Sequence, residues 1–168
     1  MGIFTTEKFN SLADLFAHEL KDLYDAEHRI TEALPQMADK AANPQLKHAF
    51  TKHLRQTERQ IERLNSVFEH RGMDAERVKC DGMVGLLKEG SAILSAEGDS
   101  DTIDAALIAA AQKVEHYEIA SYGTVRALAQ QLNDSYSAEL LLETLDEEKE
   151  TDMKLTQIAE GAVNPASA

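Results

Sequence analysis

Two glutamates and a tyrosine in the stretch QKVEHYEIASY, residues 112–122, have the types and spacing of a metal site. If this stretch is helical, Glu115, Glu118 and Tyr122 lie on one side of it, because residues three and four apart are neighbours on a helix. No lysine or arginine stands three or four positions from either glutamate. Two like charges so close together are unfavourable unless a cation binds or water solvates both. The stretch therefore indicates a metal site.

Other glutamates share this pattern, a position near an apolar helical stripe with no cation three or four positions away. The full set is Glu19, Glu27, Glu115, Glu118, Glu147 and Glu148. Glu58 and Glu62 do not belong to it, because neighbouring arginines such as Arg59 are placed to pair with them on the surface. For any one of these acids the alternative interpretation is a solvated helix face, since glutamate is seldom fully buried.

Helices are expected to position these side chains, because apolar residues recur at helical spacing over most of the chain. Ser11 can open the first helix, and Pro35 should kink that helix or end its regular part. Asn43 and Pro44 are a typical helix start, and the second helix should stop at Gly72. The short link between these two helices predicts that they are antiparallel neighbours.

The third and fourth helices are expected at about residues 101–131 and 135–160. The segment 72–101 is too long for a tight connection and should carry a short apolar helix at about 81–96. Two antiparallel hairpins joined by one long connection form the topology that ferritin-like folds use. The expected fold is therefore all-α, a ferritin-like four-helix bundle with one long crossover that carries a short extra helix.

Hairpin geometry selects among the candidate acids. A turn near residue 133 would set Glu118 level with about residue 148, and a turn near residue 42 would set Glu27 level with residues 56–58. One layer of the bundle would then hold Glu27, Glu115, Glu118 and Glu147, with His53 about one turn away. Two divalent ions would offset so many carboxylates, and carboxylates with an imidazole suit iron or manganese.

Each of these residues also has an ordinary structural interpretation. His53 can be a core histidine that bonds one carbonyl group, and Tyr122 can be a core aromatic residue. Glu147 belongs to the acidic run DEEKE, which is typical of a surface. No catalytic role is expected for His116 or for Cys80, since a small buried thiol is the common case. The metal interpretation depends on the coincidence of all four helices with the crossover.

Length and composition fit one domain, residues 1–168, with about 1–10 as a lead-in and 162–168 as a frayed tail. The chain has 17 Lys+Arg against 30 Asp+Glu, and its net charge of −13 disfavours binding to nucleic acid or to an anionic membrane. No stretch reaches the roughly 20 apolar residues that cross a bilayer. MGIFTTEKFN does not have the pattern of a secretory signal, and a single cysteine fits a reducing compartment. We therefore expect a cytoplasmic protein.

A family pattern is carried by five stretches: LYDAEHRITEALPQMADKA, HLRQTERQ, KCDGMVGLL, KVEHYEIASYGTVRALA and LLLETLDEEKETDMKLT. With them the chain resembles the YciF-like branch of the ferritin-like superfamily, a group of bacterial stress-associated proteins. The resemblance covers nearly the whole chain. KCDGM together with EHYEIASY is specific, since neither is a generic helix pattern.

The resemblance implies a rubrerythrin-like bundle that forms a homodimer, with a di-iron-type carboxylate site. The ligands that it implies are Glu27, Glu115, Glu118 and Glu147. The chain departs from the Glu-x-x-His pattern of ferritins and rubrerythrins in two places. The second helix has His53 followed by Gln56 where a carboxylate is expected, and the fourth has no histidine after Glu147.

The leading hypothesis is a stress-response protein with a dinuclear iron or manganese site that handles iron, O₂ or peroxide. Its ligands would be the four glutamates, with His53 as a further ligand or as their partner. The alternative is a non-enzymatic homodimer that serves as a structural or partner-binding scaffold with a degenerate metal site. Protection of DNA is disfavoured by the net charge and by the lack of a basic tail.

Overall fold

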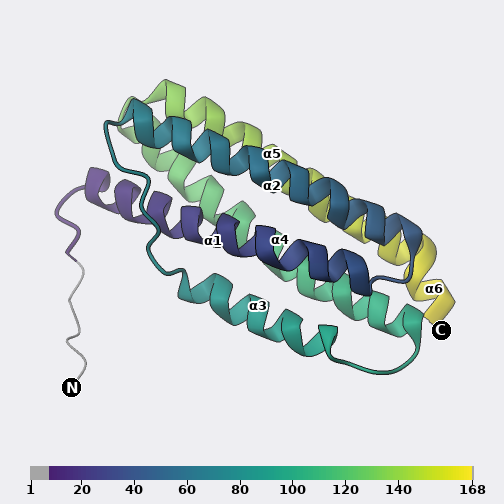
Figure 1. Cartoon of the computed structure of the whole chain (residues 1–168). Coiled ribbons are helices and arrows are strands. Elements are labelled where there is room, and N and C mark those ends of the chain that lie inside the picture. The colour runs from purple at the N-terminus through teal and green to yellow at the C-terminus, as the bar shows by residue number, and fades with distance from the viewer. Residues whose placement is uncertain (1–7, 168) are drawn as a thin grey trace, which may run out of the picture.

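The computed structural model describes residues 8–167, and these form helices without any strand. Four long helices run side by side, and a shorter helix, α3, lies along α1 and α4 in the crossover (Figure 1). Their bounds are α1 (Leu12–Lys40), α2 (Pro44–His70), α3 (Asp81–Leu94), α4 (Ser100–Gln131) and α5 (Ser135–Ile158). The expected all-α bundle with one long crossover and a short extra helix is confirmed. No helix within residues 8–167 is both long enough and apolar enough to cross a membrane.

The helix ends follow the capping residues in the sequence. The Ser11 side chain accepts a hydrogen bond from the Asp14 amide at 3.1 Å, and the Asn43 side chain caps α2 in front of Pro44. Gly72 follows α2 with φ +63°, a left-handed conformation that glycine adopts without strain. Pro35 does not end α1, which continues to Lys40.

The end of the chain differs from our expectation. Where we expected a frayed tail, α5 is followed directly by a π-helical turn, η1 (Ala159–Val163), and by a short helix, α6 (Asn164–Ser167). Val163 is fully buried and belongs to the apolar core. Burial of this apolar side chain stabilises the packing of the last turn against the bundle.

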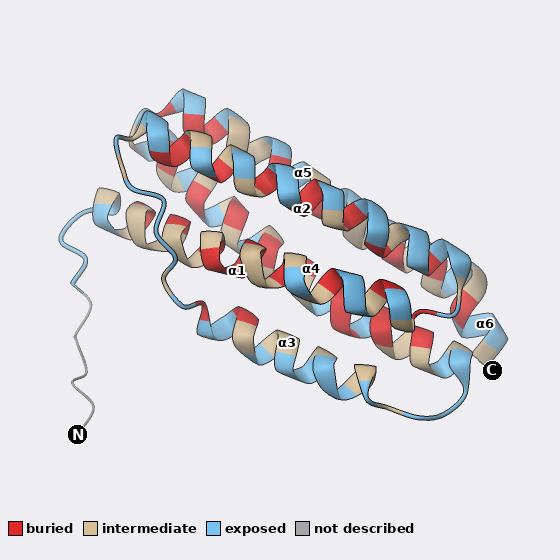
Figure 2. Ribbon diagram, in the orientation of Figure 1, coloured by how far each residue is buried: buried red, intermediate tan, exposed pale blue. Residues whose placement is uncertain are grey.

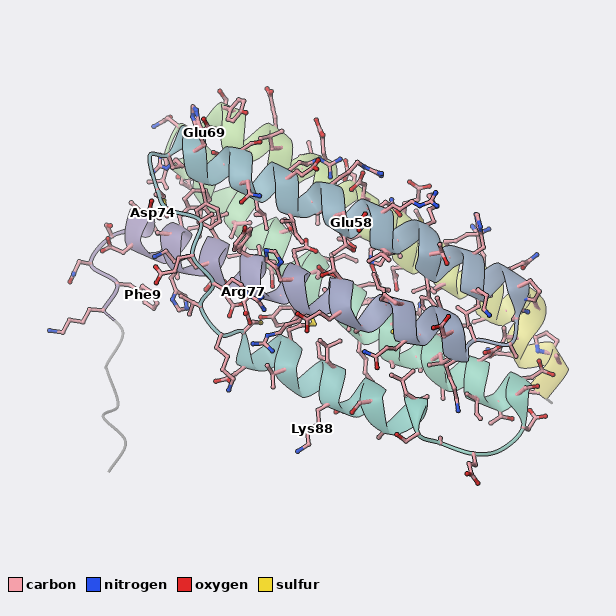
Figure 3. The ribbon with its side chains drawn as sticks, in the orientation of Figure 1. Phe9, Glu58, Glu69, Asp74, Arg77 and Lys88 are labelled. Atoms are coloured by element: carbon pink, nitrogen blue, oxygen red, sulfur yellow. The ribbon has the colours of Figure 1, made fainter. Side chains whose placement is uncertain are left out.

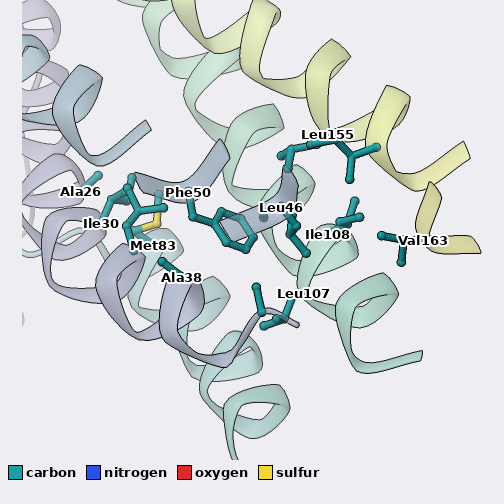
Figure 4. Close-up of a cluster of buried hydrophobic side chains, with 14 of the residues drawn as sticks. Ala26, Ile30, Ala38, Leu46, Phe50, Met83, Leu107, Ile108, Leu155 and Val163 are labelled. Atoms are coloured by element: carbon teal, nitrogen blue, oxygen red, sulfur yellow. The ribbon is translucent and has the colours of Figure 1, made fainter. Parts of the chain in front are cut away.

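The inward faces of the helices are buried and their outer faces are exposed, as Figure 2 shows. The apolar core consists of two separate clusters. The first includes Ala26, Ile30, Phe50, Met83, Leu107 and Leu155, which are drawn in Figure 4. The second includes Phe16, Leu20, Leu64, Tyr122, Val125 and Leu141. On α2, α4 and α5 the buried glutamates and His53 lie between the stretches that form the two clusters, so a polar layer crosses the middle of the bundle.

A buried carboxylate attaches the crossover to α1. Asp25 accepts hydrogen bonds from the Cys80 amide at 2.9 Å, from Arg77 Nε at 2.9 Å and from Arg29 Nε at 2.5 Å. Figure 3 shows Arg77 on the irregular segment that leads into α3. Since Cys80 is the N-cap of α3, the Asp25 carboxylate fixes the point at which that helix begins.

Helix α3 also contacts α4 through a tyrosine. The Tyr117 hydroxyl donates to the Asp22 carboxylate at 2.9 Å and lies 3.0 Å from the Cys80 sulfur. A β-carbon on Gly82 would lie only 2.7 Å from the Tyr117 ring. The sequence CDG therefore leaves room for this ring, and only glycine fits at position 82 without a shift of its neighbour.

Candidate metal centre

One buried histidine and three buried glutamates meet in the middle of the bundle. His53 comes from α2, Glu115 and Glu118 from α4, and Glu148 from α5. Each offers one donor atom, and these atoms all lie within 4.8 Å of one another. None of the four residues is more than 3% exposed. Three helices thus bring together donors from distant parts of the sequence, at the spacing that a metal ion requires.

The contacts of His53 favour a ring nitrogen that is free to bind a metal. The Thr151 hydroxyl donates to the Glu147 carbonyl at 3.0 Å, so its oxygen can accept the Nδ1 proton of His53, 3.4 Å away. In a neutral ring this arrangement would leave Nε2 without a proton, so that a cation between the ring and the carboxylates could bind its lone pair. Nε2 lies 3.3 Å from Glu115 Oε1 and 3.7 Å from Glu148 Oε2, without hydrogen-bond geometry to either.

Glu27 adds a carboxylate from α1, so that all four long helices contribute to the centre. It is fully buried, and the Tyr122 hydroxyl donates a hydrogen bond to its Oε1. Burial raises the pKa of Glu27 to about 8, while the bond from Tyr122 acts in the opposite direction. Its second oxygen has no hydrogen-bond partner. We use the name carboxylate layer for Glu27, His53, Glu115, Glu118 and Glu148.

Burial and mutual repulsion govern the charge of this layer. Burial raises the pKa of Glu118 well above its ordinary value, and the nearby Glu27 and Glu115 raise it further. The pKa of Glu148 is raised for the same reasons. Burial lowers the pKa of His53, but the surrounding carboxylates, Glu115 foremost, together outweigh this effect and the pKa of His53 is raised. Without a cation, the layer retains protons that carboxylates in water would lose.

Unsatisfied polar atoms are concentrated in this layer. Within residues 8–167, the buried side-chain atoms without a hydrogen-bond partner belong to Glu27, His53, Gln60, Glu115, Glu118 and Glu148. Buried polar groups in folded proteins are otherwise almost always paired, so each exception requires a cause. Both carboxylate oxygens of Glu118 are buried without a hydrogen-bond partner. Carboxylate oxygens and one imidazole nitrogen fit a divalent iron or manganese ion, which would satisfy these atoms together.

Glu147, which we expected among the ligands, lies outside this group. Its carboxylate is paired with Arg63 from α2, with Nη1 and Oε2 2.7 Å apart. Burial alone would raise the pKa of Glu147, but Arg63 lowers it below its ordinary value. Glu148 supplies the donor from α5 instead. The sequence carries a signal for the burial of Glu148, because it lies seven residues after Leu141 and seven before Leu155 on the apolar stripe of α5, and all three are buried.

The structure brings four of the other sequence-predicted residues together, and it places His53 in the layer and not one turn away from it. Glu27, His53, Glu115 and Glu118 lie together in the carboxylate layer. Glu58, which the sequence assigns to the surface, is exposed on α2 (Figure 3).

Two glutamines on α2 occupy positions near the layer. Gln60, which sequence reasoning missed, is fully buried and donates from its amide to Glu148 and, at 3.0 Å, to Glu147. Gln56 is 6% exposed, and its side chain forms no hydrogen bond within the described part of the chain. Glutamine carries no charge, so α2 brings no carboxylate to the layer at these two positions. His53 is the candidate ligand that α2 contributes.

Comparison with known proteins places this centre in a family. The chain is 48% identical over 155 residues to Protein YciF of Escherichia coli (strain K12), which covers 92% of this chain and 93% of the relative. The crystal structure of the E. coli stress protein YciF superposes with a TM-score of 0.89 at 47% identity, covering 93% of this chain and 99% of that one. YcfI from Rhodopseudomonas palustris gives a TM-score of 0.89 at 41% identity, with the same coverage of both chains.

A more distant structure shares the fold alone. A protein from Xanthomonas campestris pv. campestris superposes with a TM-score of 0.72 at 19% identity, covering 91% of this chain and 94% of that one. The family described as a domain of unknown function, DUF892, matches residues 11–168, which include the whole bundle and every residue of the carboxylate layer. The chain therefore belongs to the DUF892 family.

Proposed function

We propose that this protein is a ferritin-like stress-response protein that binds two iron or manganese ions in the carboxylate layer and handles iron, oxygen or peroxide. The observation that carries the proposal is the set of buried ligand atoms without hydrogen-bond partners, of which those of His53, Glu115, Glu118 and Glu148 belong to residues whose donor atoms lie within 4.8 Å of one another. A link to stress is supported by 48% identity to YciF, whose crystal structure describes a stress protein.

In this proposal, different residues of the carboxylate layer would bind each of the two ions. His53, Glu115 and Glu148 would hold one ion, because their donor atoms converge. Glu27 would supply a ligand to the other, and Glu118 would be available to both, since neither of its oxygens has another partner. Two reduced iron ions would supply the electrons that reduce oxygen or peroxide. The Tyr122 hydroxyl orients Glu27 by donating to one oxygen and leaves the other oxygen for the metal.

A single substitution tests the proposal. Glu118→Ala should remove iron binding, with a loss of affinity of at least about 10–100-fold, because it deletes the carboxylate that serves both ions. The measurement is iron per chain after anaerobic addition of Fe(II), with circular dichroism to check that the helices are retained. Glu147→Ala is the matched control and should bind iron like the wild type, because Glu147 is paired with Arg63. Unchanged stoichiometry in folded Glu118→Ala would contradict the proposal.

The alternative function is a structural or partner-binding scaffold with a degenerate metal site. It is supported by the neutral amide of Gln60, which already occupies one oxygen of Glu148, and by the description of YcfI as a candidate structural protein. Thermal unfolding with and without a chelator separates the two functions, since a ligand that binds only the native state stabilises it. A chelator lowers the midpoint for the metalloprotein and leaves it unchanged for the scaffold.

A further inference from the structure

A small cavity adjoins the carboxylate layer on the side of the first apolar cluster. Its volume is about 30 Å³, and His53 and Glu115 form part of its wall. The rest of the wall is almost entirely apolar, with Phe50, Val114 and Leu155 among its side chains. The cavity therefore lies directly between candidate metal ligands and the dry interior of the bundle.

A larger groove lies outside this cavity, between α2 and α5. Its volume is about 540 Å³, and its lining includes Lys52, Gln56 and Lys154. The groove and the cavity have two lining residues in common, Ala49 and Thr151. These short side chains separate the two spaces, so a molecule that passes between them moves from the surface to the metal ligands.

The cavity selects its occupant by size and polarity. A volume of about 30 Å³ accommodates one diatomic molecule or about two waters, and apolar cavities of folded proteins stay dry. The one hydroxyl in the wall, that of Thr151, already donates to the Glu147 carbonyl. An ion or hydrogen peroxide would lose its hydrogen bonds to water there and would find polar partners only at the end of the cavity formed by His53 and Glu115, not along its apolar walls. An uncharged apolar molecule loses none.

We propose that this cavity is a binding site for dioxygen, which enters from the groove past Ala49 and Thr151. Dioxygen rather than peroxide is then the oxidant that reaches the centre by this path. The role of the bound gas rests on the proposed function, but its binding requires only the apolar walls and can be tested on metal-free protein.

Xenon is a suitable probe, since it occupies the small apolar cavities that dioxygen can enter. Metal-free protein under increasing xenon pressure should show saturable methyl NMR shifts at Val114 and Leu155. Ala111→Val, which adds two methyl groups to the wall, should abolish these shifts, and Val114→Ala, which enlarges the cavity, should strengthen xenon binding. Ala120→Val is the matched control, because Ala120 is exposed on the same helix and lines neither space.

Circular dichroism establishes that each variant is folded before xenon is added. Absence of saturable shifts in the wild type, or wild-type xenon binding by folded Ala111→Val, would overturn the proposed site. Fe(II) bound to Ala111→Val should be oxidised by dissolved oxygen more slowly than Fe(II) bound to the wild type, with the same number of iron ions per chain. Xenon binding without iron binding would refute the proposed function and support the cavity as a gas site. Iron binding without xenon binding would support the proposed function and refute the cavity as a gas site.

Discussion

At the scale of single residues, Thr151 determines how His53 meets the carboxylates. Its hydroxyl donates to the Glu147 carbonyl and leaves its oxygen for Nδ1 of His53. Groups that orient a metal-ligating histidine in this way usually contribute strongly to metal affinity, although they do not touch the metal. If the centre binds a metal, Thr151 would therefore contribute to its affinity through His53.

Thr151→Val is expected to weaken metal binding by about 10–100-fold, because it removes the acceptor for the Nδ1 proton while keeping the side-chain shape. Isothermal titration with Mn(II) measures the change, and Thr151→Ser should restore most of the affinity. Thr51→Val is the matched control. Thr51 also bonds the carbonyl four residues earlier, at 2.9 Å, but it is exposed on the outside of α2. Equal affinities in Thr151→Val and wild type would contradict this role.

Much of the candidate centre could be predicted from residue spacing. Glu115 and Glu118 were identified by their lack of a local cation, and both are buried in the layer. The choice between Glu147 and Glu148 depends on a rotation of α5 by one residue, which an estimate of height along a hairpin cannot resolve. Gln60 was missed because a glutamine on a helix carries no signal of burial in its own sequence.

At the scale of secondary-structure elements, Asp25 joins the crossover to the bundle. Burial by itself would raise the pKa of this carboxyl, but bonds from Arg29, the Cys80 amide and Arg77 lower it below its ordinary value. The ionised form is therefore the one that stabilises the folded state. Its contribution is present above the pKa that Asp25 has in the unfolded chain.

Asp25→Asn should destabilise the protein by about 2 kcal/mol at neutral pH, because charge-assisted hydrogen bonds are lost. Urea unfolding at several pH values measures the difference from the wild type. That difference should hold from neutral pH to about pH 4 and then shrink, as the wild-type carboxylate is protonated. Asp39→Asn, an exposed position on the same helix, should change little. A difference that grows towards low pH would contradict this account.

Gly82→Ala should destabilise the protein by about 1–3 kcal/mol, because its methyl group would force the Tyr117 ring away from Cys80 and Asp22. Gly85→Ala lies on the same helix in open space and should instead be neutral or stabilising by up to about 1 kcal/mol. Thermal denaturation of both variants makes the comparison. If both variants gain stability, the close approach of Tyr117 does not constrain position 82.

At the scale of the whole molecule, the carboxylate layer opposes folding when no cation is bound. Mn(II) at about 100 times its dissociation constant should raise the free energy of unfolding by about 2.7 kcal/mol. Affinity should rise between pH 6 and pH 8, because the pKa of Glu27 is about 8 and the metal must displace this proton. Scanning calorimetry measures the stability, and Glu118→Ala should not respond to Mn(II). A wild type that shows no response to metal would exclude the metal centre.

The arrangement of the whole chain was easier to predict than the centre. Apolar stripes, the caps at Ser11 and Asn43 and the length of the segment 72–101 together specify the bundle and its crossover. Pro35 does not end α1, and η1 and α6 occupy the end of the chain, where we expected a frayed tail. In both places the buried residues beyond the break, Ala38 and Val163, favour continued helix.

The polar layer between two apolar clusters also fixes the register of the four helices. If one helix slid along its neighbours by a single turn, an acid such as Glu27 or Glu148 would enter an apolar cluster and a leucine would face the remaining carboxylates. Either mismatch would leave a charge buried without a partner, at a cost of several kcal/mol. The same residues that would bind a metal would therefore also favour the native register during folding, because compact bundles with a shifted helix would be less stable.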